Sequence, residues 1–123
     1  MSSSYRDLIV WQRAMDLAEA IYRATASFPK DELYGLVSQL RRAAVSVASN
    51  IAEGQGRLTV GEFRHFLGIA RGSVLEVETQ LTLCQRLGYL SINTVAPLVE
   101  TCEEIKRMLH GLSESIAQPT TRN

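Results

Sequence analysis

Apolar residues recur every three or four positions in four separate segments of this chain, and that spacing constrains its fold more than any other feature. Side chains at this spacing share one face of an α-helix, because the helix has about 3.6 residues per turn. We expect helices at about residues 7–27, 31–53, 60–87 and 94–117, followed by a tail at 118–123. Short connections make consecutive helices antiparallel. The sequence therefore predicts an all-α, antiparallel up-down-up-down four-helix bundle, formed by a single domain over residues 1–123.

Residues that cap or stop helices separate the four segments. Asp31 is placed to cap the first turn of the second helix, and the Gly-Gln-Gly run at 54–56 breaks that helix. Thr59 and Glu62 have the spacing of a capping box at the start of the third helix. Gly88 lies where a left-handed C-cap belongs.

The first helix carries more apolar surface than one core needs. At about 100° per residue its apolar side chains form two stripes about 110° apart, which together cover about 200°. A helix that faces a single core needs a stripe of only about 100° or a little more. One stripe comprises Leu8, Trp11, Met15, Ala18, Tyr22 and Thr25, and the other comprises Val10, Ala14, Leu17, Ile21, Ala24 and Phe28. We therefore expect a homo-oligomer, with an oligomer-interface or structural role for Val10, Ala14, Leu17, Ile21 and Phe28.

Two glycines, Gly68 and Gly72, lie one turn apart inside the third predicted helix. Each costs about 1 kcal/mol relative to alanine in a helix interior, so another contribution has to offset them. The close approach of a neighbouring helix is the expected compensation. Both glycines therefore receive an oligomer-interface or structural role.

The composition excludes several classes of partner and compartment. Thirteen basic and thirteen acidic residues give a formal net charge of zero, so no strong global field draws the chain to DNA or to an anionic membrane. No apolar run approaches the roughly 18 residues that span a bilayer, and the N-terminus does not have the pattern of a secretory signal. We expect a cytoplasmic protein with no membrane partner. Cys84 and Cys102 occupy apolar positions of helical patterns, which favours buried side chains over a disulfide or redox pair.

No pattern of catalytic or cofactor-binding residues stands out. The sequence has no glycine-rich loop between a strand and a helix, which a nucleotide site would need. The pair Glu-x-x-His occurs once, as Glu62 and His65, whereas a di-iron bundle needs it on two helices with carboxylates from the other two. No serine has a base at helical spacing that would make it a nucleophile. We expect a protein that is not an enzyme and uses no metal or cofactor.

Arginines between residues 38 and 72 concentrate the positive charge. This segment holds five arginines and two glutamates, whereas residues 73–118 hold three basic residues and six glutamates. Arginine binds phosphates and carboxylates bidentately, and repetition around an oligomer would sum modest patches into a phosphate-binding surface. The candidate nucleic-acid-binding residues are Arg41, Arg42, Arg57, Arg64 and Arg71. The alternative is that these arginines pair with carboxylates, within or between subunits.

Several short motifs occur in an order that resembles a known family. They include Trp11-Gln-Arg-Ala14, Gln39-Leu-Arg-Arg-Ala43, Ser49-Asn-Ile-Ala-Glu-Gly54 and Ile69-Ala-Arg-Gly-Ser73. The ordered set, over about residues 5–112, is similar to the bacterial four-helix-bundle proteins named for 23S ribosomal RNA intervening sequences. This resemblance implies a homopentameric ring of bundles. A more distant relative, the accessory protein of diversity-generating retroelements, is a similar pentamer that binds nucleic acid and a reverse transcriptase.

The most specific of these motifs also has a physical interpretation. Asn50 is polar, and Glu53 and Gly54 follow at the end of the second predicted helix. A hydrogen-bonded Asn50 side chain can tie that helix to a neighbouring backbone. We therefore expect Asn50, Glu53 and Gly54 to have a structural or oligomer-interface role rather than a catalytic one.

Two functions remain open after these observations. The leading hypothesis is a non-enzymatic oligomeric scaffold that binds RNA or DNA through repeated arginines. The alternative is a protein-binding adaptor without nucleic-acid activity, which presents apolar or acidic surface to another protein. Fold alone does not decide between them, because one fold hosts many functions.

Overall fold

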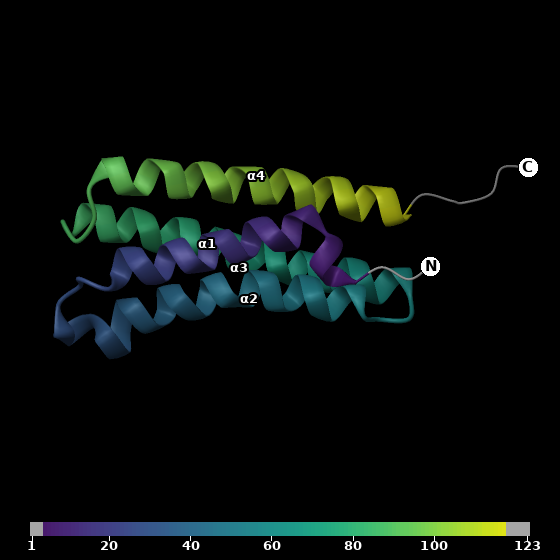
Figure 1. The fold of residues 1–123 in the computed structure, drawn as a ribbon, viewed down its shortest axis with the longest axis horizontal. Coiled ribbons are helices and arrows are strands. Elements are labelled where there is room, and N and C mark those ends of the chain that lie inside the picture. The colour runs from purple at the N-terminus through teal and green to yellow at the C-terminus, as the bar shows by residue number, and fades with distance from the viewer. Residues whose placement is uncertain (1–3, 118–123) are drawn as a thin grey trace, which may run out of the picture.

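Four long α-helices make up most of residues 4–117, which are the residues that the computed structural model describes. They are α1 (Ile9–Thr25), α2 (Ser38–Gln55), α3 (Val60–Arg86) and α4 (Ile92–Ala117). Successive helices run in opposite directions along one long axis (Figure 1). Each helix packs against the next one in the chain, and α4 also packs against α1. The predicted all-α four-helix bundle is confirmed, and the predicted tail at 118–123 lies outside the described residues.

The start of the second helix differs most from its predicted position. Residues between α1 and α2 form a 3-10 helix, η2 (Lys30–Glu32), and a π-helical turn, η3 (Leu33–Val37), so regular α-helix begins only at Ser38. Gly35 interrupts the helical backbone within η3, with φ −110° and ψ −107°. The expected cap by Asp31 is wrong, because the neighbouring Glu32 carboxylate accepts the Leu36 N–H at 3.2 Å.

Glu32 also connects the two loops at this end of the bundle. Its carboxylate accepts a hydrogen bond from the Tyr89 hydroxyl at 2.9 Å, and the Tyr89 ring packs on Phe28 with centroids 5.1 Å apart. The hydrogen bond to Glu32 raises the pKa of Tyr89, because it stabilises the protonated hydroxyl. The half-buried Phe28 therefore has a structural role at the end of α1.

The caps of α3 follow the sequence in part. The Thr59 hydroxyl accepts the Glu62 N–H at 3.1 Å, which is one half of the expected capping box. A complete capping box lies instead at Ser4 and Asp7, around the short 3-10 helix η1 (Tyr5–Asp7). Gly88 has φ +82°, which confirms the predicted left-handed residue after α3.

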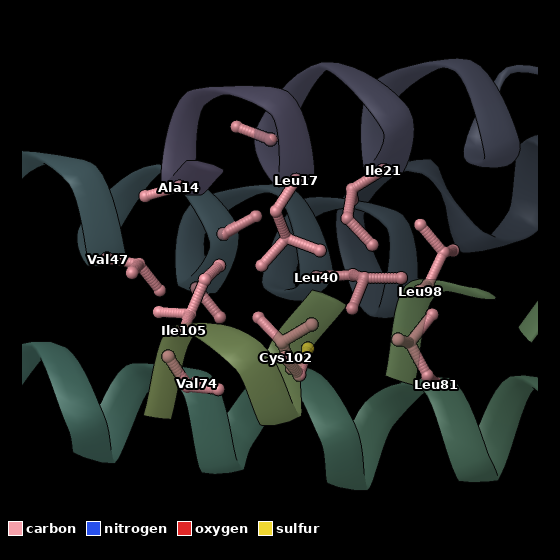
Figure 2. Packing of buried hydrophobic residues seen from close by; sticks show 14 of the residues in the cluster. Ala14, Leu17, Ile21, Leu40, Val47, Val74, Leu81, Leu98, Cys102 and Ile105 are labelled. Atoms are coloured by element: carbon pink, nitrogen blue, oxygen red, sulfur yellow. The ribbon is translucent and has the colours of Figure 1, made fainter. Parts of the chain in front are cut away.

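The core lies between the four helices and is formed by the predicted apolar stripes. Figure 2 shows side chains from all four helices meeting there, among them Leu17, Leu40, Val74 and Ile105. Each of these four is at most 1% exposed. Interiors packed this way lose stability when even one methylene is removed or added. Helix α1 buries Val10, Ala14, Leu17 and Ile21 of one stripe, and of the other stripe it buries Ala18 and Thr25.

The buried stripe of α1 is the one to which an oligomer interface had been assigned. Val10, Ala14, Leu17 and Ile21 are at most 4% exposed within a single chain, so they have no surface left for a second copy. Of the two roles expected for them, oligomer interface or structural, their burial in the core fits the structural one. The other stripe carries the surplus: Met15 and Tyr22 are 37% and 46% exposed, and Trp11 is only partly buried.

The close approach between helices occurs at Gly54 and not at Gly68 or Gly72. Gly54 is buried within α2 and does not end it. A Cβ at Gly54 would lie 2.8 Å from Cβ of Phe66 and 3.2 Å from the carbonyl oxygen of Phe63, both on α3. A Cβ at Gly68 or Gly72 would meet nothing within 4 Å. The expected packing of these two glycines against a neighbouring helix is therefore wrong within one chain.

Both cysteines are buried thiols. Cys84 and Cys102 are fully buried and free, as the helical pattern predicted. Burial raises the pKa of Cys84 to about 11 and that of Cys102 to about 12. The reactive thiolate is therefore scarce at neutral pH. Within residues 4–117, no helix has the length and apolar character needed to cross a membrane.

We predict that Gly54→Ala lowers the free energy of unfolding, by up to about 2 kcal/mol. Strain of about 1–3 kcal/mol from a crowded methyl group exceeds the gain of about 1 kcal/mol in helix propensity. The matched control is Gly111→Ala in α4, where a Cβ meets nothing within 4 Å. Urea unfolding followed by circular dichroism should give opposite shifts for the two variants. A Gly54→Ala protein as stable as the parent would contradict the close approach.

Candidate nucleic-acid interface

The structure divides the five predicted arginines among four locations. Arg41 has a structural role between α1 and α2. Its guanidinium lies 4.4 Å from the centroid of the Tyr22 ring, and its Nε donates to the Thr25 hydroxyl at 2.9 Å. A second donor reaches the Tyr22 carbonyl at 3.3 Å. Arg41 is therefore engaged by its own chain and does not face the other arginines.

Arg57 is also engaged, at the end of α2. It pairs with Glu53 at 2.6 Å, and its guanidinium lies 4.7 Å from the centroid of the Phe66 ring. This contact gives Glu53 a structural partner, as expected for that residue. The alternative that some arginines pair with carboxylates therefore holds for Arg57 within one chain.

Arg42 lies on the α2–α3 face with a polar network beside it. It lines a hollow of about 400 Å³ together with Gln39, Ser46, Glu76 and Gln80. The Ser46 hydroxyl lies 2.8 Å from that of Ser73 on α3. The Asn50 amide donates to the Ser46 carbonyl and hydroxyl at 2.8 and 2.9 Å. Asn50 thus ties α2 to α3 through Ser46, and not directly through a neighbouring backbone as expected.

Arg64 and Arg71 share one groove between α3 and α4, as their spacing predicted for one helix face. Arg64 donates to the Ser113 hydroxyl at 3.0 Å and lies 3.8 Å from the Glu114 carboxylate. Arg71 is exposed, and its guanidinium has no hydrogen bond or salt bridge to any of residues 4–117. The groove therefore contains one loosely paired and one free guanidinium from α3.

Helix α4 adds a guanidinium and an imidazole that sequence reasoning missed. Arg107 and His110 are exposed and line the same groove as Arg71. Arg107, like Arg71, has no hydrogen bond or salt bridge within the described part of the chain. Six glutamates in residues 73–118 gave that segment a negative balance, which concealed these two residues. Their spacing of three, which places both on one helix face, was a usable signal.

The α3–α4 groove has two lobes that share Arg71 and His110. The larger lobe, of about 510 Å³, is completed by Glu103, Lys106 and Arg107. The smaller lobe, of about 130 Å³, is completed by Arg64, Gly68 and Ser113, with Leu67 and Leu109 as its apolar floor. Guanidinium groups from two helices thus line two adjoining hollows, and guanidinium is a group that binds phosphate oxygens bidentately.

Lys106 fixes the wall of the larger lobe. Its ammonium lies 3.0 Å from Glu103 and 3.0 Å from Glu78, so it connects α4 to α3. Hydrogen bonds to Glu103 and Glu78 raise the pKa of Lys106, and the same contact lowers the pKa of Glu103. One ammonium is shared by two carboxylates, so this cluster keeps one negative charge at the wall of the lobe. Arg71 and Arg107 are the guanidinium groups of the groove that have no partner among residues 4–117.

A second surface is apolar and lies between α1 and α2. It forms a hollow of about 300 Å³ lined by Tyr5, Trp11, Met15, Ala18, Val45, Ala48, Ser49 and Ala52. A further set of apolar side chains, Ile69, Leu75 and Leu83, is exposed on α3 at 40–45%. Scattered exposed apolar residues are ordinary, whereas a contiguous patch marks an interaction surface.

Metal chemistry finds no support among residues 4–117. No group of three or more His, Cys, Asp or Glu side chains lies close enough there to hold a metal ion. Glu62 and His65 are both exposed in the first turns of α3. The aromatic neighbour of His65 is Phe66, at 5.5 Å between ring centroids.

The fold and the groove define a four-helix-bundle protein with a basic depression between its last two helices. The family model described as 23S rRNA-intervening sequence protein matches residues 6–111. This chain belongs to that family.

A solved structure supports the same fold. It is a protein with unknown function from the S23 ribosomal protein family of Bacteroides thetaiotaomicron. The two chains are 21% identical, the match covers 86% of this chain and 99% of the other, and the TM-score is 0.78. A comparison with curated proteins finds no match.

We predict that Arg41→Ala lowers the free energy of unfolding by about 1–2 kcal/mol, because it removes a cation–π contact and two hydrogen bonds. Arg42→Ala is the matched control, since the adjacent side chain is exposed and should change stability by less than about 0.5 kcal/mol. Thermal or urea unfolding of both variants measures the difference. Equal stability of the two variants would refute the structural role of Arg41.

Proposed function

We propose that this protein is a non-enzymatic, cytoplasmic homo-oligomer that binds RNA or DNA as a scaffold. Phosphate groups are held in the α3–α4 groove. The observation that carries the proposal is the convergence of Arg71 and Arg107, both without a hydrogen bond or salt bridge among residues 4–117, on the same groove as Arg64 and His110. The buried free thiols fit the reducing compartment.

Local charge supports this proposal although the net charge is zero. At physiological ionic strength charges are screened beyond about 8 Å, so a bound phosphate responds mainly to the charges of the groove itself. There the basic residues Arg64, Arg71, Lys106 and Arg107 outnumber the acidic residues Glu78, Glu103 and Glu114. Arginine keeps its charge at any pH at which the protein folds. Each phosphate that the groove neutralises also releases counterions from the nucleic acid, which favours binding at low salt.

Oligomerisation is the second part of the proposal. The exposed apolar side chains lie in two different places, the α1–α2 hollow and the positions Ile69, Leu75 and Leu83 of α3. Two unlike surfaces on one chain suit head-to-tail contacts, which form a ring when the rotation between copies closes. We propose five subunits, the number that the family resemblance implies. A ring would repeat the groove in every copy.

The alternative function is a protein-binding adaptor. The apolar hollow between α1 and α2 favours it, because Trp11, Met15 and Val45 would offer anchoring side chains to a partner helix. A pull-down that recovers one protein partner after nuclease treatment, from a protein that binds no nucleic acid, would replace the proposed function with this one.

We predict that Arg71→Ala weakens binding to RNA or DNA about tenfold at about 50 mM salt and reduces the slope of log K against log[salt] by about 1, since one phosphate contact is lost. Arg64→Ala should act in the same direction. Fluorescence anisotropy with labelled RNA and DNA oligonucleotides measures both quantities.

The control for charge is Arg23→Ala, which removes an exposed arginine of α1 whose one ion pair is a 3.7 Å contact with Glu19. Its affinity should stay within about twofold of the parent, because it lies outside the groove and replaces no phosphate contact. A parent protein that binds neither RNA nor DNA at about 50 mM salt would refute the proposed function.

We predict a mass of about 68 kDa by light scattering, which corresponds to five copies of the 13.6 kDa chain. Met15→Glu and Val45→Glu should reduce this mass, because each places a charge in the apolar α1–α2 hollow. Ser115→Glu, on the exposed surface of α4, adds the same charge and should leave the mass unchanged. A mass of one chain for the parent protein would contradict the oligomer.

A further inference from the structure

Gly68 has no packing role within one chain. It lies inside α3, where glycine costs about 1 kcal/mol relative to alanine, and a Cβ there would meet no atom within 4 Å. Gly72 shares both properties. The two glycines differ in position, because Gly68 lines the smaller lobe of the α3–α4 groove and Gly72 is absent from the lining of either lobe. Helix stability therefore does not explain why glycine occupies either position. Only Gly68 lines the groove, so the groove could explain the glycine at position 68 but not the one at position 72.

We propose that Gly68 keeps the α3–α4 groove open, so that the phosphodiester backbone of one nucleic-acid strand lies along it across Arg64 and Arg71. The inference rests on the proposed function and adds to it the part of the ligand that is bound and the residue that admits it. Gly68 acts as a positioning residue through the space that it leaves free.

The smaller lobe is small enough that a side chain at position 68 would fill much of it. The lobe measures about 130 Å³, and Arg64, Arg71 and His110 surround it. One water occupies about 30 Å³ in the liquid, so the lobe has room for about four waters. The four carbons of a leucine side chain at position 68 would fill most of that space. A phosphate group would then be excluded from the position between the two guanidinium groups.

The spacing of the arginines lets both contact the backbone of one strand. Arg64 and Arg71 are seven residues apart, which is about 10.5 Å along the helix axis at about 1.5 Å per residue. In a duplex one strand advances about 3.4 Å along the duplex axis per nucleotide, so the two arginines span about three nucleotides of a strand in that form. Arg107 and His110 face the strand from α4. One chain thus contacts a short stretch of backbone, and repetition in an oligomer would extend it.

The lining of the groove favours the backbone over the bases. The residues that line the two lobes include no Phe, Tyr or Trp, and His110 is the one ring among them on which a base could stack. They also include no Asn or Gln, the side chains that pair with adenine. Charged groups on rigid helices position phosphates without reading sequence. Binding should therefore be independent of sequence.

The test compares Gly68→Ala and Gly68→Leu with Gly72→Ala and Gly72→Leu. All four variants should melt at or above the temperature of the parent, because both replacements favour helix and neither position is crowded. Affinity for labelled RNA and DNA oligonucleotides of two unrelated sequences should fall stepwise from Gly68 to Ala to Leu, about tenfold for leucine. The Gly72 variants should stay within about twofold of the parent on both sequences.

Each result bears on the proposal in a definite direction. If Gly68→Leu binds as tightly as the parent while Arg71→Ala is weakened, the role of Gly68 is refuted and the proposed function stands. If Arg71→Ala binds as tightly as well, both are refuted. Light scattering gives a further check, since a Gly68→Leu protein of reduced mass would assign Gly68 to a subunit contact and overturn the inference. Loss of binding with unchanged mass and a raised melting temperature would establish it.

Discussion

The packing of α2 against α3 is the contact on which the rest of the bundle depends. Gly54 removes the side chain that would otherwise collide with Phe63 and Phe66. The Ser46–Ser73 hydrogen bond then fixes the same two helices further along. Because α3 is held by α2 on one side, its opposite flank is set at a defined distance from α4. The basic groove lies between α3 and α4, which this arrangement places beside each other. Lys106 of α4 connects the two helices there through its ion pair with Glu78 of α3, and it also pairs with Glu103 of α4.

The fold was predictable because burial of apolar surface is the dominant favourable term and is periodic along a helix. Which face of each helix is buried was harder to predict from the sequence. Periodicity predicted two apolar stripes on α1. Only the positions of α2 and α4 decide that Val10, Ala14, Leu17 and Ile21 point inward while Met15 and Tyr22 do not. Glycine presents a similar difficulty. Gly54 and Gly68 carry the same intrinsic cost in a helix, and the neighbouring atoms that separate their roles lie on other helices.

The site was predictable only in part, for a related reason. A sequence shows where arginines are dense but not which partner each one meets. Arg41 and Arg57 lie over aromatic rings of their own chain, and Arg71 lies free. Arg107 and His110 come from a segment whose net charge is negative, so a count by segment hides them. Pairing across helices, and not charge density along the chain, determines which cations remain available.

The tether at Glu32 and Tyr89 makes the two ends of the bundle unequal in their dynamics. At that end one hydrogen bond and one ring contact join the α1–α2 loop to the α3–α4 loop. The opposite end has the α2–α3 loop, where Leu58 is 97% exposed, and the last turns of α4. Local opening begins where few buried contacts hold the chain, so we expect fast amide exchange to spread from this end. Arg64, Ser113 and the smaller lobe lie here. Fraying of the last turns of α4 would therefore also widen that lobe, because Ser113 lines it.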